Sequence, residues 1–255
     1  MHSHEIDYKI LGESIQIVEA ILDPGEAVIA EAGAMLYMDE GIRFETKMGD
    51  GSEPNKGFLS KLVSAGARVI SGESVFVTHF TNAAATQAKV AFAAPYPGSI
   101  VPLDLSQLHD NQVVVQQDAF LCAALGTKIS ISVSKNIGAG IFGEGFVFQK
   151  LSGDGMAFVH AGGMIIEKQL ENETLRVDTG CLVGMESSIE YSIDRVGGLK
   201  SMLFGGEGIF LTTLKGTGKI WLQSLPLGRL VEAIRGDTGK NKDKGEGSIL
   251  SDLLE

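Results

Sequence analysis

The sequence predicts an all-β protein made of three antiparallel units arranged around a pseudo-threefold axis. Three markers carry this prediction: a Gly-Glu corner, a small-residue corner upstream of it, and a glycine downstream that opens an apolar run. The Gly-Glu corner begins at Gly72, Gly143 and Gly206. Because the markers keep one order three times, we expect a triplicated β unit.

The other two markers fix the extent of each copy. The upstream corner is found at Gly33–Leu36, Asp118–Leu121 and Gly180–Val183, and the downstream glycine at Gly98–Val101, Gly163–Ile166 and Gly218–Trp221. We therefore expect repeats at about residues 14–108, 109–170 and 171–225, within a single domain spanning residues 1–235. A two-layer sandwich in which the repeats pair differently is the alternative fold.

Strands are predicted where apolar and polar residues alternate with a period of two. The runs that we expect to be equivalent are Ile42–Thr46, Ile129–Val133 and Ile189–Ile193. Turn residues separate the predicted strands, at Asp23–Gly25, Asp39–Gly41, Ser152–Gly155 and Lys215–Gly218. Many short strands with regular turns favour a sandwich, barrel or prism.

Helical periodicity is found in few places, and the predicted helices are short. The segments are Phe58–Ile70, Asn136–Phe142, Gly198–Phe204 and Leu225–Ile234. In the last of these, Pro226 suits the first turn of a helix, where a missing N–H costs little. Residues 236–255 begin with a charged, glycine-rich stretch, which predicts a flexible tail.

Charge and cysteine content restrict the partners and the compartment. A net charge of −11 disfavours nucleic-acid binding, which depends on Lys and Arg neutralising phosphates. The segment Met1–Tyr8 is polar and does not resemble a signal peptide, so we expect a cytoplasmic protein. Cys122 and Cys181 lie in apolar runs, and we expect both thiols to be buried and reduced.

The sequence offers no convincing catalytic, cofactor-binding or metal-binding residues. Gly138–Gly143 has the formal pattern of a dinucleotide-binding loop, but it lies between two predicted strands rather than between a strand and a helix. His79, His109 and His160 stand too far apart in sequence to suggest a metal site, and His2 and His4 lie at the N-terminus. No Ser or Cys has the context of a nucleophile. We therefore expect a protein that is not an enzyme and that needs no cofactor.

Two sets of repeated residues are the candidate site residues. Glu73, Glu144 and Glu207 follow the glycine corners; they either accept backbone hydrogen bonds in the turns or line the axis and bind a cation. A threefold axis would also gather the apolar segments upstream of the corners at one end of the molecule. The candidate interface residues there are Phe58, Leu62, Ile141, Phe142, Met202 and Phe204.

The segments Leu22–Glu26, Ala30–Met38, Gly72–Thr78 and Gly205–Leu211 resemble an uncharacterised bacterial and archaeal family related to yeast altered inheritance of mitochondria protein 24. The resemblance covers about Tyr8 to Leu225. It implies an all-β fold with units similar to the tryptophan RNA-binding attenuation protein. Mitochondrial relatives are implicated in organising the inner membrane, and the resemblance brings no catalytic residues.

These observations favour a non-enzymatic structural or assembly protein that forms homo-oligomers, with a protein or a membrane surface as a further partner. The alternative is a small-molecule or ion-binding module that uses the pseudo-threefold axis or an apolar pocket. A ligand binder would gather polar groups in a deep apolar pocket, whereas a scaffold would expose an extended apolar surface.

Overall fold

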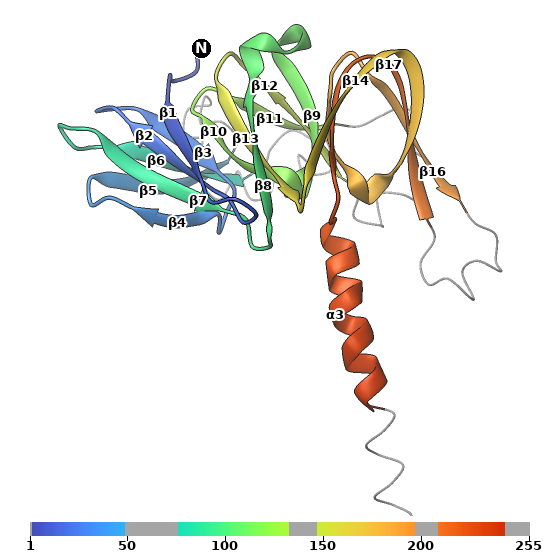
Figure 1. The fold of residues 1–255 in the computed structure, drawn as a ribbon. Coiled ribbons are helices and arrows are strands. Elements are labelled where there is room, and N and C mark those ends of the chain that lie inside the picture. Colours follow the sequence, from blue (N-terminus) through green and yellow to red (C-terminus); the bar gives the residue numbers. More distant parts are fainter. Residues whose placement is uncertain (1, 49–75, 133–146, 197–208, 243–255) are drawn as a thin grey trace, which may run out of the picture.

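The computed structural model describes residues 2–48, 76–132, 147–196 and 209–242. Within these ranges the chain forms antiparallel strands, four short 3-10 turns and one α-helix, so the all-β prediction is confirmed. The strands make three sheets that follow one another along the molecule, and the helix projects away from them (Figure 1). The Gly-Glu corners lie outside the described residues, and a rotation near 120° between them stays a prediction.

The first sheet has the strand order β1-β2-β7-β4. Its strands are β1 (Asp7–Leu11), β2 (Ile17–Leu22), β7 (Ala88–Ala93) and β4 (Met35–Met38). The second sheet has the order β5-β6-β3-β10-β13-β8. Its strands are β5 (Ile42–Met48), β6 (Phe76–Asn82), β3 (Ala27–Ala30), β10 (Phe120–Ala124), β13 (Met156–Gly162) and β8 (Gly98–Asp104).

The third sheet has the order β11-β12-β9-β15-β17-β14, and β16 also pairs with β17. Its strands are β11 (Lys128–Ser132), β12 (Phe148–Ser152), β9 (Gln112–Gln116), β15 (Leu182–Glu186), β17 (Ile209–Gln223), β14 (Ile165–Asp178) and β16 (Glu190–Val196). Because β14 and β17 are long, β17 pairs along its first half with β16 and the end of β14, and along its second half with β15 and the start of β14.

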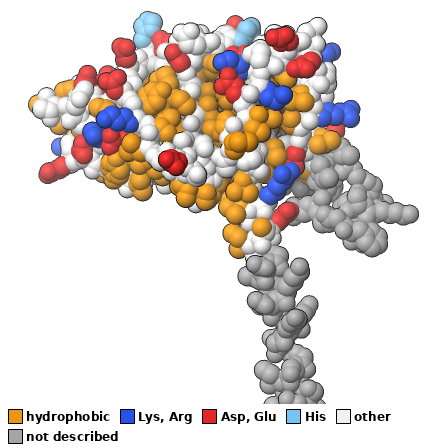
Figure 2. Space-filling model, viewed as in Figure 1, with side chains coloured by type: hydrophobic (Ala, Val, Ile, Leu, Met, Phe, Trp, Pro, Cys, Tyr) orange, Lys and Arg blue, Asp and Glu red, His pale blue; other side chains and the backbone are white. Residues whose placement is uncertain are grey.

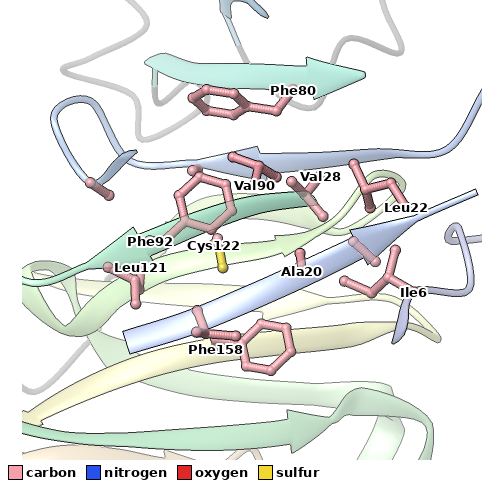
Figure 3. Packing of buried hydrophobic residues seen from close by; sticks show 14 of the residues in the cluster. Ile6, Ala20, Leu22, Val28, Phe80, Val90, Phe92, Leu121, Cys122 and Phe158 are labelled. Atoms are coloured by element: carbon pink, nitrogen blue, oxygen red, sulfur yellow. The ribbon is translucent and has the colours of Figure 1, made fainter. Parts of the chain in front are cut away.

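Hydrophobic cores fill the spaces between successive sheets. The first core lies between the first and second sheets, where Phe80 and Phe92 meet edge to face at 5.2 Å (Figure 3). The second core lies between the second and third sheets and includes Trp221. The third core packs the third sheet against β16 and the adjacent halves of β14 and β17.

The central strands serve two cores at once because successive side chains point to opposite faces of a sheet. In β3, Val28 faces the first core and Ile29 faces the second. In β9, Val113 belongs to the second core and Val114 to the third. Accordingly, β3 is apolar throughout and β9 is apolar at its three central positions, whereas the edge strand β5 mostly alternates apolar with charged residues.

Three local predictions need correction. Lys215–Gly218 is not a turn, because β17 continues through it and pairs with β14 and β16. The C-terminal helix α3 spans Leu227–Lys242, and it therefore runs on into the stretch whose composition predicts a tail. Cys122 is buried as predicted, but Cys181 is only partly buried because it lies in a 3-10 turn ahead of β15; neither forms a disulfide.

Candidate self-association edges

Two backbone junctions connect one group of strands to the next. At the first junction β3 pairs with β10, and at the second junction β9 pairs with β15. The residue pairs are Ala30–Cys122, Ile29–Ala123 and Val28–Ala124 at the first junction, and Val115–Gly184, Val114–Met185 and Val113–Glu186 at the second. Both junctions are antiparallel ladders of apolar strands that are covered on both faces.

The strand β4 has the same local pairing as β10 and β15. Each of the three pairs on one side with a longer strand, and each has a bulge after its first residue. Those first pairs are Met35–Phe92, Phe120–Val159 and Leu182–Leu222, and the next pairs skip one residue to Tyr37, Cys122 and Gly184. The other side of β10 and β15 is occupied by a junction, whereas β4 is the last strand of its sheet.

Exposure of the side chains follows this difference. Leu36 in β4 is 53% exposed, while the residues at the same place in the ladder, Leu121 and Val183, are 3% and 0% exposed. Met35 and Tyr37 are also exposed. In the region where Figure 1 places β4, the space-filling view shows hydrophobic side chains at the surface (Figure 2). Within the part of the chain that the structure describes, the edge of the first sheet is thus an apolar strand without the cover that its two counterparts have.

Polar contacts fix the orientation of this edge. The Tyr37 hydroxyl donates to the Glu19 carboxylate at 2.5 Å, and Lys89 Nζ lies 3.1 Å from the same group. The hydrogen bond from Tyr37, and then the one from Lys89, lowers the pKa of Glu19, and the pKa of Tyr37 is raised by the same bond. Asp39 accepts from the Lys89 backbone N–H at 2.8 Å and so ties the end of β4 to β7.

The second half of β14 is the matching open edge. Val177 precedes the start of β15, Leu182, by the same number of residues as Ala30 precedes the start of β4, Met35. Val177 pairs with β17 in the same way as Ala30 pairs with β6. β14 is the last strand on the path of the third sheet, and in the described residues its ladder runs along β17 alone. Arg176 is exposed at the place where β3 and β9 have buried aliphatic residues.

The face of the third sheet beside this edge is also less covered. Ile166, Val18 and Val101 occupy equivalent places in their sheets. Each pairs with the residue that lies opposite the first residue of β15, β4 or β10, just before the bulge in that strand. Val18 and Val101 are buried in the first and second cores, whereas Ile166 is 38% exposed. Asp178, at the end of β14, is held by Arg229 of α3 at 2.7 Å, and α3 then leads away from the sheets (Figure 1).

A group of titratable side chains lies near the first junction. The Glu31 residue is exposed, yet protein atoms crowd its carboxyl group; desolvation, and then the Asp118 carboxylate, raises its pKa to about 7. Burial and the same two carboxylates raise the pKa of Tyr96, whose ring meets His160 edge to face at 4.6 Å. His160 is buried with Nδ1 unpartnered among the described residues, and burial lowers its pKa to about 4.

The described residues contain no group of three or more His, Cys, Asp or Glu side chains placed to hold a metal ion. The predicted carboxylates and the predicted interface lie outside those residues, and their roles stay predictions. They are Glu73, Glu144 and Glu207, and Phe58, Leu62, Ile141, Phe142, Met202 and Phe204.

The sequence did contain a signal for the β4 edge. Part of Met35–Met38 belongs to the corner marker Gly33–Leu36, and the whole run is continuously apolar, as β10 is. Such a run is typical of a strand covered on both faces, whereas an edge strand facing water alternates. Membrane insertion is a different explanation of apolar surface, and within the described ranges no helix combines the length and apolarity that a membrane span requires.

Comparison with known proteins identifies the family. The model of the family "Mitochondrial biogenesis AIM24" matches residues 8–225. The chain belongs to the AIM24 family. An uncharacterised protein of Streptococcus pyogenes serotype M6 is 31% identical over 215 residues, which are 83% of this chain and 82% of that protein. A Streptococcus pyogenes protein solved by X-ray crystallography as a structural-genomics target has a TM-score of 0.72 and 25% identity, over 91% of this chain and 99% of its own. The predicted family resemblance is therefore confirmed.

Proposed function

We propose that this AIM24-family chain is a non-enzymatic structural protein that works as a homo-oligomer and consists of three copies of one β unit. The observation that carries the proposal is the exposed apolar edge of β4. Its two counterparts, β10 and β15, have buried side chains because a neighbouring strand pairs with them. An equivalent neighbour for β4 is supplied most simply by another subunit.

The treatment of the other sheet edges supports this interpretation. Exposed edge strands of soluble proteins usually have charged residues or proline that discourage pairing with other chains. The edge strand β5 contains Arg43, Glu45 and Lys47, and β11 begins with Lys128. The run Met35–Met38 contains neither a charge nor a proline. Among these edges, β4 is therefore the one whose composition suits a permanent partner.

The size of the sheets points the same way. The second and third sheets each have six strands on their path, with a junction at the centre. The first sheet has four strands and stops at β4, and the group β16, β17 and the end of β14 stops at the opposite open edge. Joining these two groups would extend both of them in the manner of the second and third sheets.

Sedimentation velocity of the purified full-length chain tests the proposal. We expect a species with a multiple of the 27.0 kDa chain mass that dissociates on dilution. Phe44→Asp is a matched control, because Phe44 is 60% exposed on the edge strand β5 and should leave the assembly intact. A wild-type chain that remains monomeric at all concentrations would overturn the proposal.

The interface expected from the sequence remains a separate proposal. There the double variant Leu62→Asp with Met202→Asp should weaken assembly or partner binding while the β fold survives. If the double variant leaves assembly unchanged while Leu36→Asp weakens it, the β4 edge is the interface. We propose that the chain does not bind nucleic acid, which the net charge of −11 supports, and a cytoplasmic setting stays a proposal.

Ion binding is the second candidate function, and the proximity of Glu31 to Asp118 favours it. Paired carboxylates disfavour each other's ionisation, and a hard divalent cation relieves that repulsion. Calorimetric titration with Ca²⁺ and Mg²⁺ tests this candidate. Binding that is lost in Glu31→Gln would support it, and absence of binding at millimolar concentration would exclude it.

A further inference from the structure

The geometry points to a specific contact: β4 of one copy pairs antiparallel with residues 174–178 of β14 in a second copy. This inference rests on the proposed function and names the partner surface of the same edge. The occupant of the β4 edge is thus another molecule of this chain, joined head to tail. The contact would repeat the two junctions that the chain already contains.

The two internal junctions determine the register of the new one. Tyr37 corresponds to Cys122 and Gly184, since all three follow the bulge. Val177 corresponds to Ala30 and Val115 by its place before the next strand. The expected pairs between copies are therefore Tyr37–Val177, Met38–Arg176 and Asp39–Leu175.

Backbone bonds at the first junction show which further bonds to expect. There, Glu31 N–H donates to the Leu121 carbonyl at 3.1 Å, and Leu125 N–H donates to the Ala27 carbonyl at 3.0 Å. The corresponding bonds between copies run from Asp178 N–H to the Leu36 carbonyl, and from Glu40 N–H to the Thr174 carbonyl. The ladder thus extends over residues 36–40 of one copy.

Side-chain burial on both partners agrees with this register. Leu121 and Cys122 enter the core of the strand group that precedes them in the chain. By the same geometry, Leu36 and Tyr37 would enter the third core of the partner, beside Val177. The outer face of the first sheet would then cover the partly exposed Ile166. One contact would therefore cover Leu36 and Tyr37 at one end of the molecule and Ile166 at the other.

A head-to-tail contact is favoured over symmetric pairing of β4 with β4. Pairing two β4 strands would cover one edge but leave the end of β14 and Ile166 exposed. Within a single copy the two edges cannot meet, because the first sheet and the group of β14, β16 and β17 lie at opposite ends of the described body (Figure 1). A contact between unlike surfaces produces a ring when the rotation closes and a filament when it does not.

Disulfide trapping between two differently labelled single variants tests the register. Met38→Cys is prepared in ¹⁵N-labelled form and Arg176→Cys in unlabelled form, each in a Cys181→Ser background. Directly opposed residues in a sheet have Cβ atoms about 4.5–5.5 Å apart, within reach of a disulfide after a small shift. We expect a mixed-isotope dimer after mild oxidation of the mixture, identified by mass. Phe44→Cys in place of Met38→Cys is the control and should give little of it.

The outcomes separate this inference from the proposed function. Mixed dimers of Met38→Cys and Arg176→Cys support the head-to-tail contact. Dimers of Met38→Cys with itself would identify symmetric pairing and overturn the inference. An assembly that persists without any trapped disulfide would also overturn it. In both cases the proposed function stands. A chain that is monomeric by sedimentation overturns both.

Discussion

Leu36→Asp is the most informative single substitution. In the isolated chain the Leu36 side chain is 53% exposed at an edge strand, so the fold loses little when it is replaced. In the assembly, the same side chain would be as buried as Leu121 and Val183 are at the internal junctions. The variant should therefore separate assembly from folding.

The size of the effect follows from the area that the contact covers. Complete burial of a leucine side chain contributes roughly 1.5–3 kcal/mol, and about half of the Leu36 side chain remains to be buried. Removing the apolar side chain alone should cost about 1 kcal/mol per contact. A carboxylate at that place also loses solvation without gaining a partner, which adds at least ~1–3 kcal/mol. We expect the dissociation constant of each contact to rise by roughly 30-fold or more.

Sedimentation equilibrium gives the dissociation constants, and thermal unfolding monitored by circular dichroism gives the stability of the fold. Leu36→Asp should shift the assembly towards monomer while a dilute sample, in which the wild type is also monomeric, keeps its unfolding midpoint. Phe44→Asp should change the dissociation constants by no more than a few-fold and should leave the unfolding midpoint unchanged. If Leu36→Asp assembles as tightly as the wild type, the β4 edge is not the interface. If the dilute variant unfolds early, Leu36 belongs to the core of the monomer.

Further predictions concern the buried and crowded ionisable groups. The pKa of Glu31 is raised from 4.5 to about 7, so between these pH values the folded state binds a proton that the unfolded state has lost. The free energy of unfolding should therefore fall as pH rises through this range. Urea titrations at a series of pH values measure this fall, and Glu31→Gln should remove it. The pKa of His160 is lowered from 6.5 to about 4, because burial favours its neutral form. This shift contributes roughly 3 kcal/mol to the free energy of unfolding above pH 6.5, and the contribution is lost on acidification towards pH 4. In His160→Phe the free energy of unfolding should depend less on pH over this range. A thiol reagent should modify Cys181 before Cys122, because only Cys122 is fully buried; equal rates would contradict this.

The fold class could be predicted from the sequence because alternation and turn residues are local signals. Asp39–Gly41 and Ser152–Gly155 do separate strands, as their composition indicates. The glycines of Lys215–Gly218 gave the wrong answer, because glycine suits an extended irregular strand as well as a turn. Here β17 continues through them, with Gly216 at φ 133° and Gly218 at φ 155°, and its pairing with two strands outweighs the local preference.

The site was harder to predict because it depends on which strand edges remain unpaired. The apolar character of Met35–Met38 is visible in the sequence, but β10 and β15 have the same character and are buried. Only the pairing of the strands shows that β4, among the described strands, has β7 as a neighbour on one side and none on the other. The charge of Asp118 likewise acts on the carboxyl group of Glu31 although the two residues stand far apart in the chain, because the pairing of β3 with β10 brings their surroundings together.

Amide hydrogen exchange at a series of protein concentrations tests the central claim most directly, since it reports on both edges of the unmodified chain at once. Backbone N–H groups that gain a ladder partner exchange slowly, and those at an open edge exchange fast. We predict that the N–H groups on the open side of each edge, those of Met38 and Glu40 and those of Arg176 and Asp178, are protected at high concentration and lose protection together on dilution, while β10 and β15 stay protected throughout. The Asp39 N–H already donates to the Lys89 carbonyl within one copy and should stay protected at every concentration. Fast exchange of either edge at every concentration would contradict the account.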